Sequence, residues 1–288
     1  MSHVKRLRMT MNAMKSGELR SKLSQSVSSS TAKADLQAAL SFDGPGFHVF
    51  EGTHKLSPNF RISRVALENL SKHPKWSPVL NDLHENAHGG GSGGRFQLAR
   101  KDCPVSIQDI VDHYLRFVQT LSDGDSHLKH SLLELQSVSH LLKSNGEVEN
   151  KDQSLHLDAG KKEYSIVELI ERPQFKQAFT ATSMPPCSII IPLHNDIELR
   201  VIRGSHRAVW RMKVNEQLKV ENIVIRVGEI FIFRQDLIHG GVAYKECNIR
   251  LHVYLDHVNI GHFRIRGPNV ITGVEDVVEE YEIEDGGG

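Results

Sequence analysis

Short segments of β-type sequence follow one another through the second half of the chain, and they constrain its fold more than any other feature. Each is four to eight residues long, consists mostly of apolar or β-branched residues, and is set off from its neighbours by Gly, Pro, Asn or Asp. Segments this short predict strands rather than core helices. They are Cys187–Leu193, Ile197–Arg203, Ile223–Val227, Ile230–Phe233 and Asn248–Leu255.

Helical sequence is scarcer and lies mainly in the first half. From Ser106 to Leu121 the apolar residues fall on one face of a helix, and Ser106 with Asp109 has the spacing of a capping box. A shorter helix is predicted from Ile62 to Leu70, ending before Pro74. Leu132–Leu142 is interpreted as a strand, and Phe42–Phe50 as a turn that leads into a short strand. Many strands and few helices favour a mainly β fold with flanking helices, in which two sheets pack as a jelly roll.

A histidine and an aspartate lie two residues apart in the sequence Gln153-Ser-Leu-His156-Leu-Asp158. On a strand, residues two apart point to the same face, so His156 and Asp158 can offer ligand atoms to one ion. A further histidine, His239, closely follows the predicted strand Ile230–Phe233. Two histidines and one carboxylate on one face of an octahedral metal, with other positions open, suit non-haem Fe(II) and dioxygen.

The same spacing occurs a second time, at His194 and Asp196, and this pair also precedes His239. Pro192–Asp196, however, interrupts an apolar strand and has the composition of a hairpin turn, where Asn and Asp are favoured. We therefore expect the pair at His156, rather than the pair at His194, to bind the metal.

An arginine lies in the middle of the alternating segment Asn248–Leu255. Arg250 shares one face of this strand with His252 and Tyr254, and the other face is apolar. A buried guanidinium is costly unless an anion meets it, and its planar fork suits a carboxylate. We expect an anionic ligand at Arg250. His252 either contacts that ligand or is a polar residue satisfied by its neighbours.

Taken together, these residues resemble the 2-oxoglutarate- and Fe(II)-dependent dioxygenases, and within them the phytanoyl-CoA dioxygenase-like branch. Those enzymes carry His-x-Asp, a distal His, and an Arg about eleven positions later; here His239 and Arg250 differ by eleven. The branch also places a Gly-Ser-His turn between the two halves, and Arg203-Gly-Ser-His206 looks like it. The resemblance covers roughly Leu132 to Asp256, under half of the chain.

The resemblance implies a double-stranded β-helix of cupin-like form. It implies that His156, Asp158 and His239 hold Fe(II), and that Arg250 binds the far carboxylate of 2-oxoglutarate, with His252 as a candidate second contact. Dioxygen would take the remaining position, and the expected outcome is hydroxylation of an unidentified small-molecule substrate with release of succinate and CO2. Arg203 stands where the branch usually has proline. With no acyl-CoA signature in the chain, a polar metabolite is expected rather than a lipid.

Two other classes of function stay open at the level of sequence. A barrel of this kind can be a non-catalytic cupin-like binding module or a sensor of iron or oxygen. It can also be an oxygenase that acts on a nucleic acid or a protein, and the basic N-terminal arm is the feature that favours nucleic acid. The presence of every ligand type together with the arginine favours a small-molecule enzyme. Slow consumption of 2-oxoglutarate without substrate would distinguish an enzyme from a binding module.

Charge is balanced over the chain but not along it. The formal net charge is zero, which gives no global field for nucleic acid or for a membrane surface. Residues 1–34 carry seven Lys or Arg and one acid, whereas residues 273–288 carry seven acids and no base. We expect a basic, Ser-rich disordered arm at 1–35, a dioxygenase domain at 36–270 with a flexible Gly-rich loop at 89–94, and an acidic disordered tail at 271–288.

Three widely spaced cysteines suggest neither a disulfide framework nor a zinc motif. An intracellular protein is therefore expected, cytoplasmic by default, with nuclear or organellar targeting by the basic arm as the alternative. No run of residues has the length and apolar character of a membrane span. The sequence leaves the oligomeric state open.

Overall fold

The computed structural model of the protein describes residues 30–50, 62–78, 95–122, 131–146, 152–153, 155–158, 173–180, 184–210 and 219–256. The expected basic arm up to residue 29, the Gly-rich loop at 89–94 and the acidic tail at 271–288 lie outside the described residues. Within the described residues, the first regular element is a helix that begins at Ser30.

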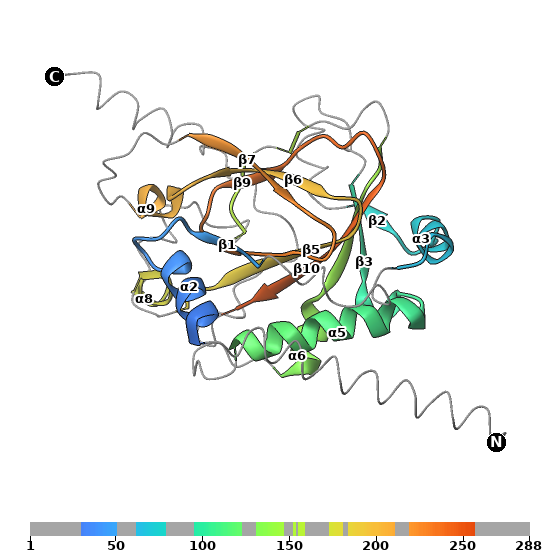
Figure 1. Ribbon diagram of the computed structural model, residues 1–288, viewed down its shortest axis with the longest axis horizontal. Helices are drawn as coiled ribbons and strands as arrows, with labels where there is room; N and C mark the ends of the chain where they lie inside the picture. The colour runs from blue at the N-terminus through green and yellow to red at the C-terminus, as the bar shows by residue number, and fades with distance from the viewer. Residues whose placement is uncertain are drawn as a thin grey trace.

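Two antiparallel sheets form the body of the molecule (Figure 1). The larger sheet has seven strands in the order β1-β8-β5-β10-β4-β3-β2, and the smaller has three in the order β7-β6-β9. This confirms the prediction of a mainly β, double-sheet fold with flanking helices. The strands are β1 Phe47–Phe50, β2 Ser77–Pro78, β3 Arg95–Ala99, β4 His140–Ser144, β5 Cys187–His194, β6 Ile197–Ile202, β7 Val220–Ile225, β8 Ile230–Arg234, β9 His239–Gly241 and β10 Asn248–Leu255.

The longest described helix, α5, runs along the outer face of the larger sheet, as Figure 1 shows. Its apolar side chains pack in one cluster with alternate residues of β5, β8 and β10. Burying each such side chain contributes about 1.5–3 kcal/mol, so this face anchors the sheet that carries much of the site. The helices are α2 Ser30–Leu40, α3 Arg64–Ser71, the 3-10 turn η3 Arg100–Asp102, α5 Val105–Ser122, α6 Leu132–Val138, α8 Pro173–Thr180 and α9 Ser205–Val209.

A second core fills the space between the two sheets. Phe231 and Phe233 of β8 meet Leu199 and Val201 of β6 there, and all four are buried. The pleat of β10 separates the two cores. Its odd-numbered apolar residues belong to the helix-side cluster, and its even-numbered residues face the interior between the sheets. The alternation predicted for this strand is therefore confirmed.

One predicted element is wrong. Leu132–Leu142 does not form a single strand, because α6 occupies Leu132–Val138 and β4 begins only at His140. A full capping box starts this helix: the Ser131 side chain accepts from the Glu134 N–H while the Glu134 carboxylate accepts from the Ser131 N–H. The Ser-x-x-Glu pattern is visible in the sequence, but a leucine-rich run of this length suits helix and strand equally.

The start of α5 also differs from the prediction. The helix begins at Val105, and the N–H groups of Ile107 and Gln108 bond to the Pro104 carbonyl. Ser106 therefore lies inside the first turn and is not the N-cap residue. The helix otherwise covers the predicted range.

The prediction of a hairpin turn at Pro192–Asp196 is confirmed only as a turn: β5 continues through Pro192 to His194, and the turn connects the two sheets, because β5 belongs to the larger sheet and β6 to the smaller. Strand β5 ends at His194 and β6 begins at Ile197. Asn195 adopts the left-handed conformation, with φ of 57°, and the Asp196 carboxylate accepts from the Val227 N–H at 2.8 Å. The three cysteines are free thiols. No helix in the described part of the chain has the length and apolar character to cross a membrane.

Candidate metal centre

Three potential metal ligands meet between the sheets. One side-chain atom each of His156, Asp158 and His239 lies within 4.8 Å of the others. His156 and Asp158 come from the short stretch 155–158, and His239 is the first residue of β9. All three side chains are buried.

Backbone pairing brings the two histidines together. His156 and His239 form an antiparallel bridge, in which the His156 N–H donates to the His239 carbonyl at 2.8 Å and the His239 N–H to the His156 carbonyl at 3.0 Å. Their ring centroids are 4.4 Å apart. Asp158 lies two residues beyond His156, so the extended backbone turns its side chain to the same side.

The orientation of the His239 ring is fixed by its own turn. Its Nδ1 lies 3.0 Å from the Leu237 carbonyl, an acceptor, so Nδ1 carries the hydrogen. The Phe233 ring packs edge-on against the imidazole at a centroid distance of 4.5 Å. Nε2 is thereby left with its lone pair, 3.8 Å from Oδ1 of Asp158. This is the tautomer that a metal-ligating histidine needs.

The Asp158 carboxylate is oriented by two neighbours on the larger sheet. The Ser188 hydroxyl of β5 donates to Oδ2, and Nε2 of His252 on β10 lies 3.5 Å from the same oxygen. Oδ1 is left on the side of His239. Burial by itself raises the pKa of Asp158. The positive charge of the imidazoles of His239, His252 and His156, when they are protonated, and a hydrogen bond from His252 outweigh it and lower the pKa below its ordinary value.

Gln153 lies beside His156. Its Nε2 is 3.5 Å from Nε2 of His156, and its Oε1 accepts from the Gly241 N–H at 3.2 Å. The Gln153 N–H also donates to the Gly241 carbonyl at 2.7 Å. Gln153, just before the metal pair, is therefore held against β9, the strand that supplies His239.

Arg250 is buried in the same interior with neutral partners. Its Nη1 donates to the Ser144 hydroxyl at 3.0 Å and to Oδ1 of Asn248 at 3.1 Å, and the Tyr244 ring lies 5.8 Å from the guanidinium carbon. Among the described residues no carboxylate forms an ion pair with it. Burial lowers the pKa of Arg250, which is the electrostatic cost of keeping this charge out of water.

Arg250 and His252 are two residues apart on β10 and point to the same side, so about 7 Å of strand separates the arginine from the residue that approaches Asp158. The alternative pair does not join this cluster. His194 is the last residue of β5 and Asp196 lies in the turn that follows, and His194 lines a surface hollow with residues of α3 instead. His206 bonds to the Phe42 carbonyl at 2.8 Å and also lies outside the cluster.

The donor set fits a divalent transition metal. Two neutral imidazole nitrogens and one carboxylate oxygen converge from one side, which makes the triad compatible with iron binding. Sequence reasoning missed two groups that orient these ligands, the Ser188 hydroxyl and the Leu237 carbonyl. The polar Ser188 in an otherwise apolar strand was the available signal for the first, whereas a backbone carbonyl leaves no signal in the sequence.

No protein-family model matches the sequence, and no curated protein is significantly similar to it. Several solved structures resemble it at low identity. SnoN, a non-haem α-ketoglutarate-dependent epimerase from nogalamycin biosynthesis, aligns with 13% identity and a TM-score of 0.47 over 78% of this chain and 83% of its own.

SnoK, a non-haem α-ketoglutarate-dependent carbocyclase from the same biosynthesis, aligns with 13% identity and a TM-score of 0.47 over 81% of this chain and 92% of its own. A prolyl-4-hydroxylase from Pseudomonas putida aligns with 10% identity and a TM-score of 0.40 over 78% and 98%. Similarity at this level does not assign an activity to this chain.

Proposed function

We propose that the protein is an Fe(II)- and 2-oxoglutarate-dependent dioxygenase of the phytanoyl-CoA dioxygenase-like branch, which hydroxylates a small polar molecule. One observation carries the proposal. Three ligand atoms of the type that binds non-haem iron lie within 4.8 Å of one another, and Arg250, whose described partners are neutral, lies in the same interior. A binding barrel without a charged ligand has no need of such an arginine, because a buried charge without an anion is costly.

Each residue has a defined part in this proposal. His156, Asp158 and His239 hold the metal, and Arg250 binds the far carboxylate of 2-oxoglutarate through charge-assisted hydrogen bonds. When bound, iron and 2-oxoglutarate supply the oxidising chemistry, with succinate and CO2 as products and dioxygen as the oxidant. Ser188 and His252 keep Oδ2 of Asp158 engaged, so that Oδ1 is the oxygen directed toward the other two ligands.

The chain also excludes water from the site. His156, His239, Arg250 and His252 are each less than 10% exposed. In such an environment the attraction between the guanidinium and a carboxylate is much stronger than in water. The residues that choose the substrate belong to loops, and the small polar substrate is proposed because Arg203 replaces the usual proline and no acyl-CoA signature is present.

The decisive experiment is an anaerobic titration of the metal-free protein, first with Fe(II) and then with 2-oxoglutarate, monitored by visible absorption. We expect the weak charge-transfer band of the chelate in the wild type. His156→Ala should lose the band, and Arg250→Ala should require far more 2-oxoglutarate. His194→Ala is the matched control and should behave like wild type, since His194 lies outside the cluster.

Absence of the band in the wild type would contradict the proposal. A band that disappears in His194→Ala but survives in His156→Ala would show that the other pair binds the metal. Aerobic consumption of 2-oxoglutarate without substrate gives a second readout, because an enzyme site consumes it slowly and a binding module does not.

A further inference from the structure

A buried ion pair lies at the start of the turn that delivers His239. Arg234 is the last residue of β8, and its guanidinium binds the Asp236 carboxylate in a bidentate manner, with Nε to Oδ1 and Nη2 to Oδ2 both at 2.8 Å. Each residue is only 1% exposed. The pair therefore fixes the first residues of the short connection between β8 and β9.

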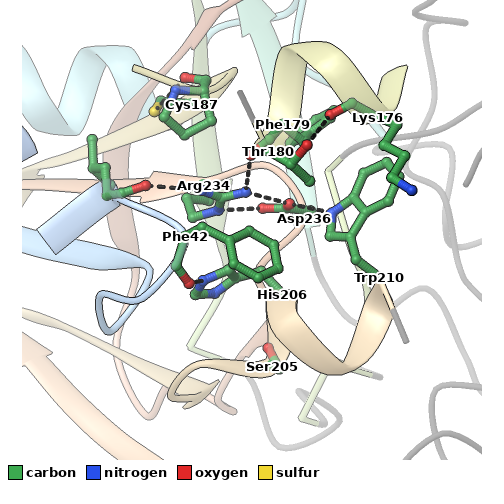
Figure 2. Close-up of polar contacts among 12 residues, drawn as sticks. Phe42, Lys176, Phe179, Thr180, Cys187, Ser205, His206, Trp210, Arg234 and Asp236 are labelled. Atoms are coloured by element: carbon green, nitrogen blue, oxygen red, sulfur yellow. Dashed lines mark hydrogen bonds and ion pairs between the residues drawn. The ribbon is translucent and has the colours of Figure 1, made fainter. Parts of the chain in front are cut away.

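The other donors of Arg234 bind the ends of two helices. Nη1 donates to the Leu40 carbonyl at 2.9 Å, and Nη2 donates to the Phe179 carbonyl at 2.7 Å (Figure 2). Leu40 ends α2, and Phe179 is the penultimate residue of α8. Carbonyls at a helix C-terminus lack partners within the helix and carry partial negative charge, so one guanidinium satisfies both ends and a carboxylate at once.

The Asp236 carboxylate has one further donor, from α9. The indole Nε1 of Trp210, directly after that helix, donates to Oδ2 at 2.8 Å (Figure 2). The same helix holds the far end of the turn, because the Ser205 hydroxyl accepts from the Ile238 N–H at 2.9 Å. The turn is therefore held on both sides of Leu237.

Leu237 is the residue whose carbonyl orients the metal ligand. That carbonyl bonds to Nδ1 of His239 at 3.0 Å, and the Leu237 N–H bonds to the Arg234 carbonyl at 3.1 Å. A shift of the turn would move the carbonyl and rotate the imidazole, so the direction of Nε2 depends on how firmly the turn is held.

We propose that Arg234, Asp236 and Trp210 are positioning residues for the metal ligand His239. They hold the turn that carries the Leu237 carbonyl, and they tie it to α2 and α8. This inference rests on the proposed function, because it requires His239 to bind the metal. Through the bond between Arg234 and the Leu40 carbonyl, α2 would also help to set the geometry of the metal centre, although this helix precedes the strands of both sheets in the chain.

A purely structural role for the pair makes a different prediction. Buried ion pairs often add little net stability compared with apolar residues of the same volume, whereas removing one partner leaves an uncompensated buried charge and is strongly destabilising. If the pair served stability alone, a variant that still folds would bind metal as wild type does. If it positions His239, the folded variant would bind metal more weakly and in altered geometry.

The two tryptophans of the chain provide a matched comparison. Trp210→Phe removes the hydrogen bond to Asp236 and keeps an aromatic ring. Trp76→Phe removes an equivalent bond, from Nε1 to the Leu70 carbonyl at 2.7 Å, at α3 and away from the metal centre. Asp236→Asn is a stronger test of the same turn. The probe is Co(II) alone, added to the metal-free protein, and the readouts are its affinity, the ligand-field bands of the bound ion and the melting temperature.

We expect Trp210→Phe and Asp236→Asn to lower Co(II) affinity about 10- to 100-fold and to shift the ligand-field bands. Trp76→Phe should leave the Co(II) affinity and the ligand-field bands at wild-type values, even if its melting temperature falls as much as that of Trp210→Phe. If Asp236→Asn does not fold, Trp210→Phe carries the test.

The inference is overturned if folded Trp210→Phe binds Co(II) with wild-type affinity and spectrum, or if both tryptophan variants lose affinity equally. If wild type itself binds no Co(II), the proposed function fails and this inference falls with it. If wild type binds Co(II) and the Trp210→Phe and Asp236→Asn variants bind it equally well, the positioning role is wrong but the proposed function is not affected.

Discussion

His156 and His239 are joined through their main chains, with N–H to carbonyl distances of 2.8 and 3.0 Å, although 83 residues separate them in sequence. The bond between the two segments does not depend on either side chain. The backbone arrangement of the metal centre therefore does not require a bound metal. A ligand side chain can be removed without breaking the main-chain hydrogen bonds between the two segments.

His156→Ala and His239→Ala should accordingly unfold cooperatively when metal-free but lose stabilisation by metal. At a Co(II) concentration of 100 times Kd, wild type gains about 2.7 kcal/mol, or a rise of roughly 5 °C in melting temperature for a chain of this size. Calorimetry with and without Co(II) measures this rise, and His194→Ala should retain it. Metal stabilisation that persists in both ligand variants would contradict the assignment.

Arg250→Met should separate stability from cosubstrate binding. The substitution removes a buried charge whose described partners are the neutral Ser144 and Asn248, so the metal-free protein should gain on the order of 1 kcal/mol in unfolding free energy. Affinity for 2-oxoglutarate should fall at least tenfold, because charge-assisted hydrogen bonds are lost. Urea unfolding and calorimetric titration measure the two effects.

The control for Arg250→Met is Arg203→Met, which breaks an exposed ion pair with Glu221. Surface ion pairs of this kind contribute little to stability, so neither the unfolding free energy nor the affinity for 2-oxoglutarate should change appreciably. Wild-type affinity for 2-oxoglutarate in Arg250→Met would rule out the proposed carboxylate contact.

Ser188→Ala should weaken metal binding by freeing the Asp158 carboxylate. The buried hydroxyl donates to Oδ2, and loss of such an outer contact typically costs 10- to 100-fold in metal affinity. Ser139→Ala is the matched control, because Ser139 is equally buried and donates to the Leu135 carbonyl rather than to a metal ligand. Both variants should lose about 1 kcal/mol of stability, but only Ser188→Ala should bind Co(II) less tightly.

Acid should destabilise the fold partly through His206. Burial lowers the pKa of this imidazole to about 4, with Asp236 raising it and Arg234 and Arg207 lowering it. The unfolded chain takes up the proton near pH 6.5. Between about pH 6.5 and 4 the unfolded state therefore binds more protons than the folded state, and the unfolding free energy falls as the pH falls.

In His206→Gln this contribution should vanish. The stability advantage of wild type over the variant should shrink by roughly 3 kcal/mol from pH 7 to pH 4, as measured by urea unfolding of the metal-free proteins. The partly buried His113 on α5, whose pKa is also lowered to about 4, mainly by burial, should show a change of the same sign when it is replaced by Gln. Parallel pH profiles for wild type and His206→Gln would contradict the assignment.

Local periodicity and turn residues let the sequence predict strands β1, β5, β6, β7, β8 and β10, the turn after β5 and the two faces of β10, but not β2, β3 or β9. The prediction of a strand at Leu132–Leu142 was wrong, because the spacing of apolar residues in this leucine-rich run does not distinguish a helix from a strand. In the folded protein the first part of the run packs against α5 as a helix. That His156 and Asp158 point to the same side is likewise a local property of extended backbone.

Tertiary structure alone decided which segments meet. The sequence by itself determined the donor types at His156, Asp158, His239 and Arg250, because residue identity sets what each group can bind. It did not determine that β9 lies beside His156, that Ser188 reaches Asp158, or that Arg234 joins two helix ends to the turn before His239. Those contacts join segments far apart in the chain, and they form only when the two sheets and their helices bury a common core.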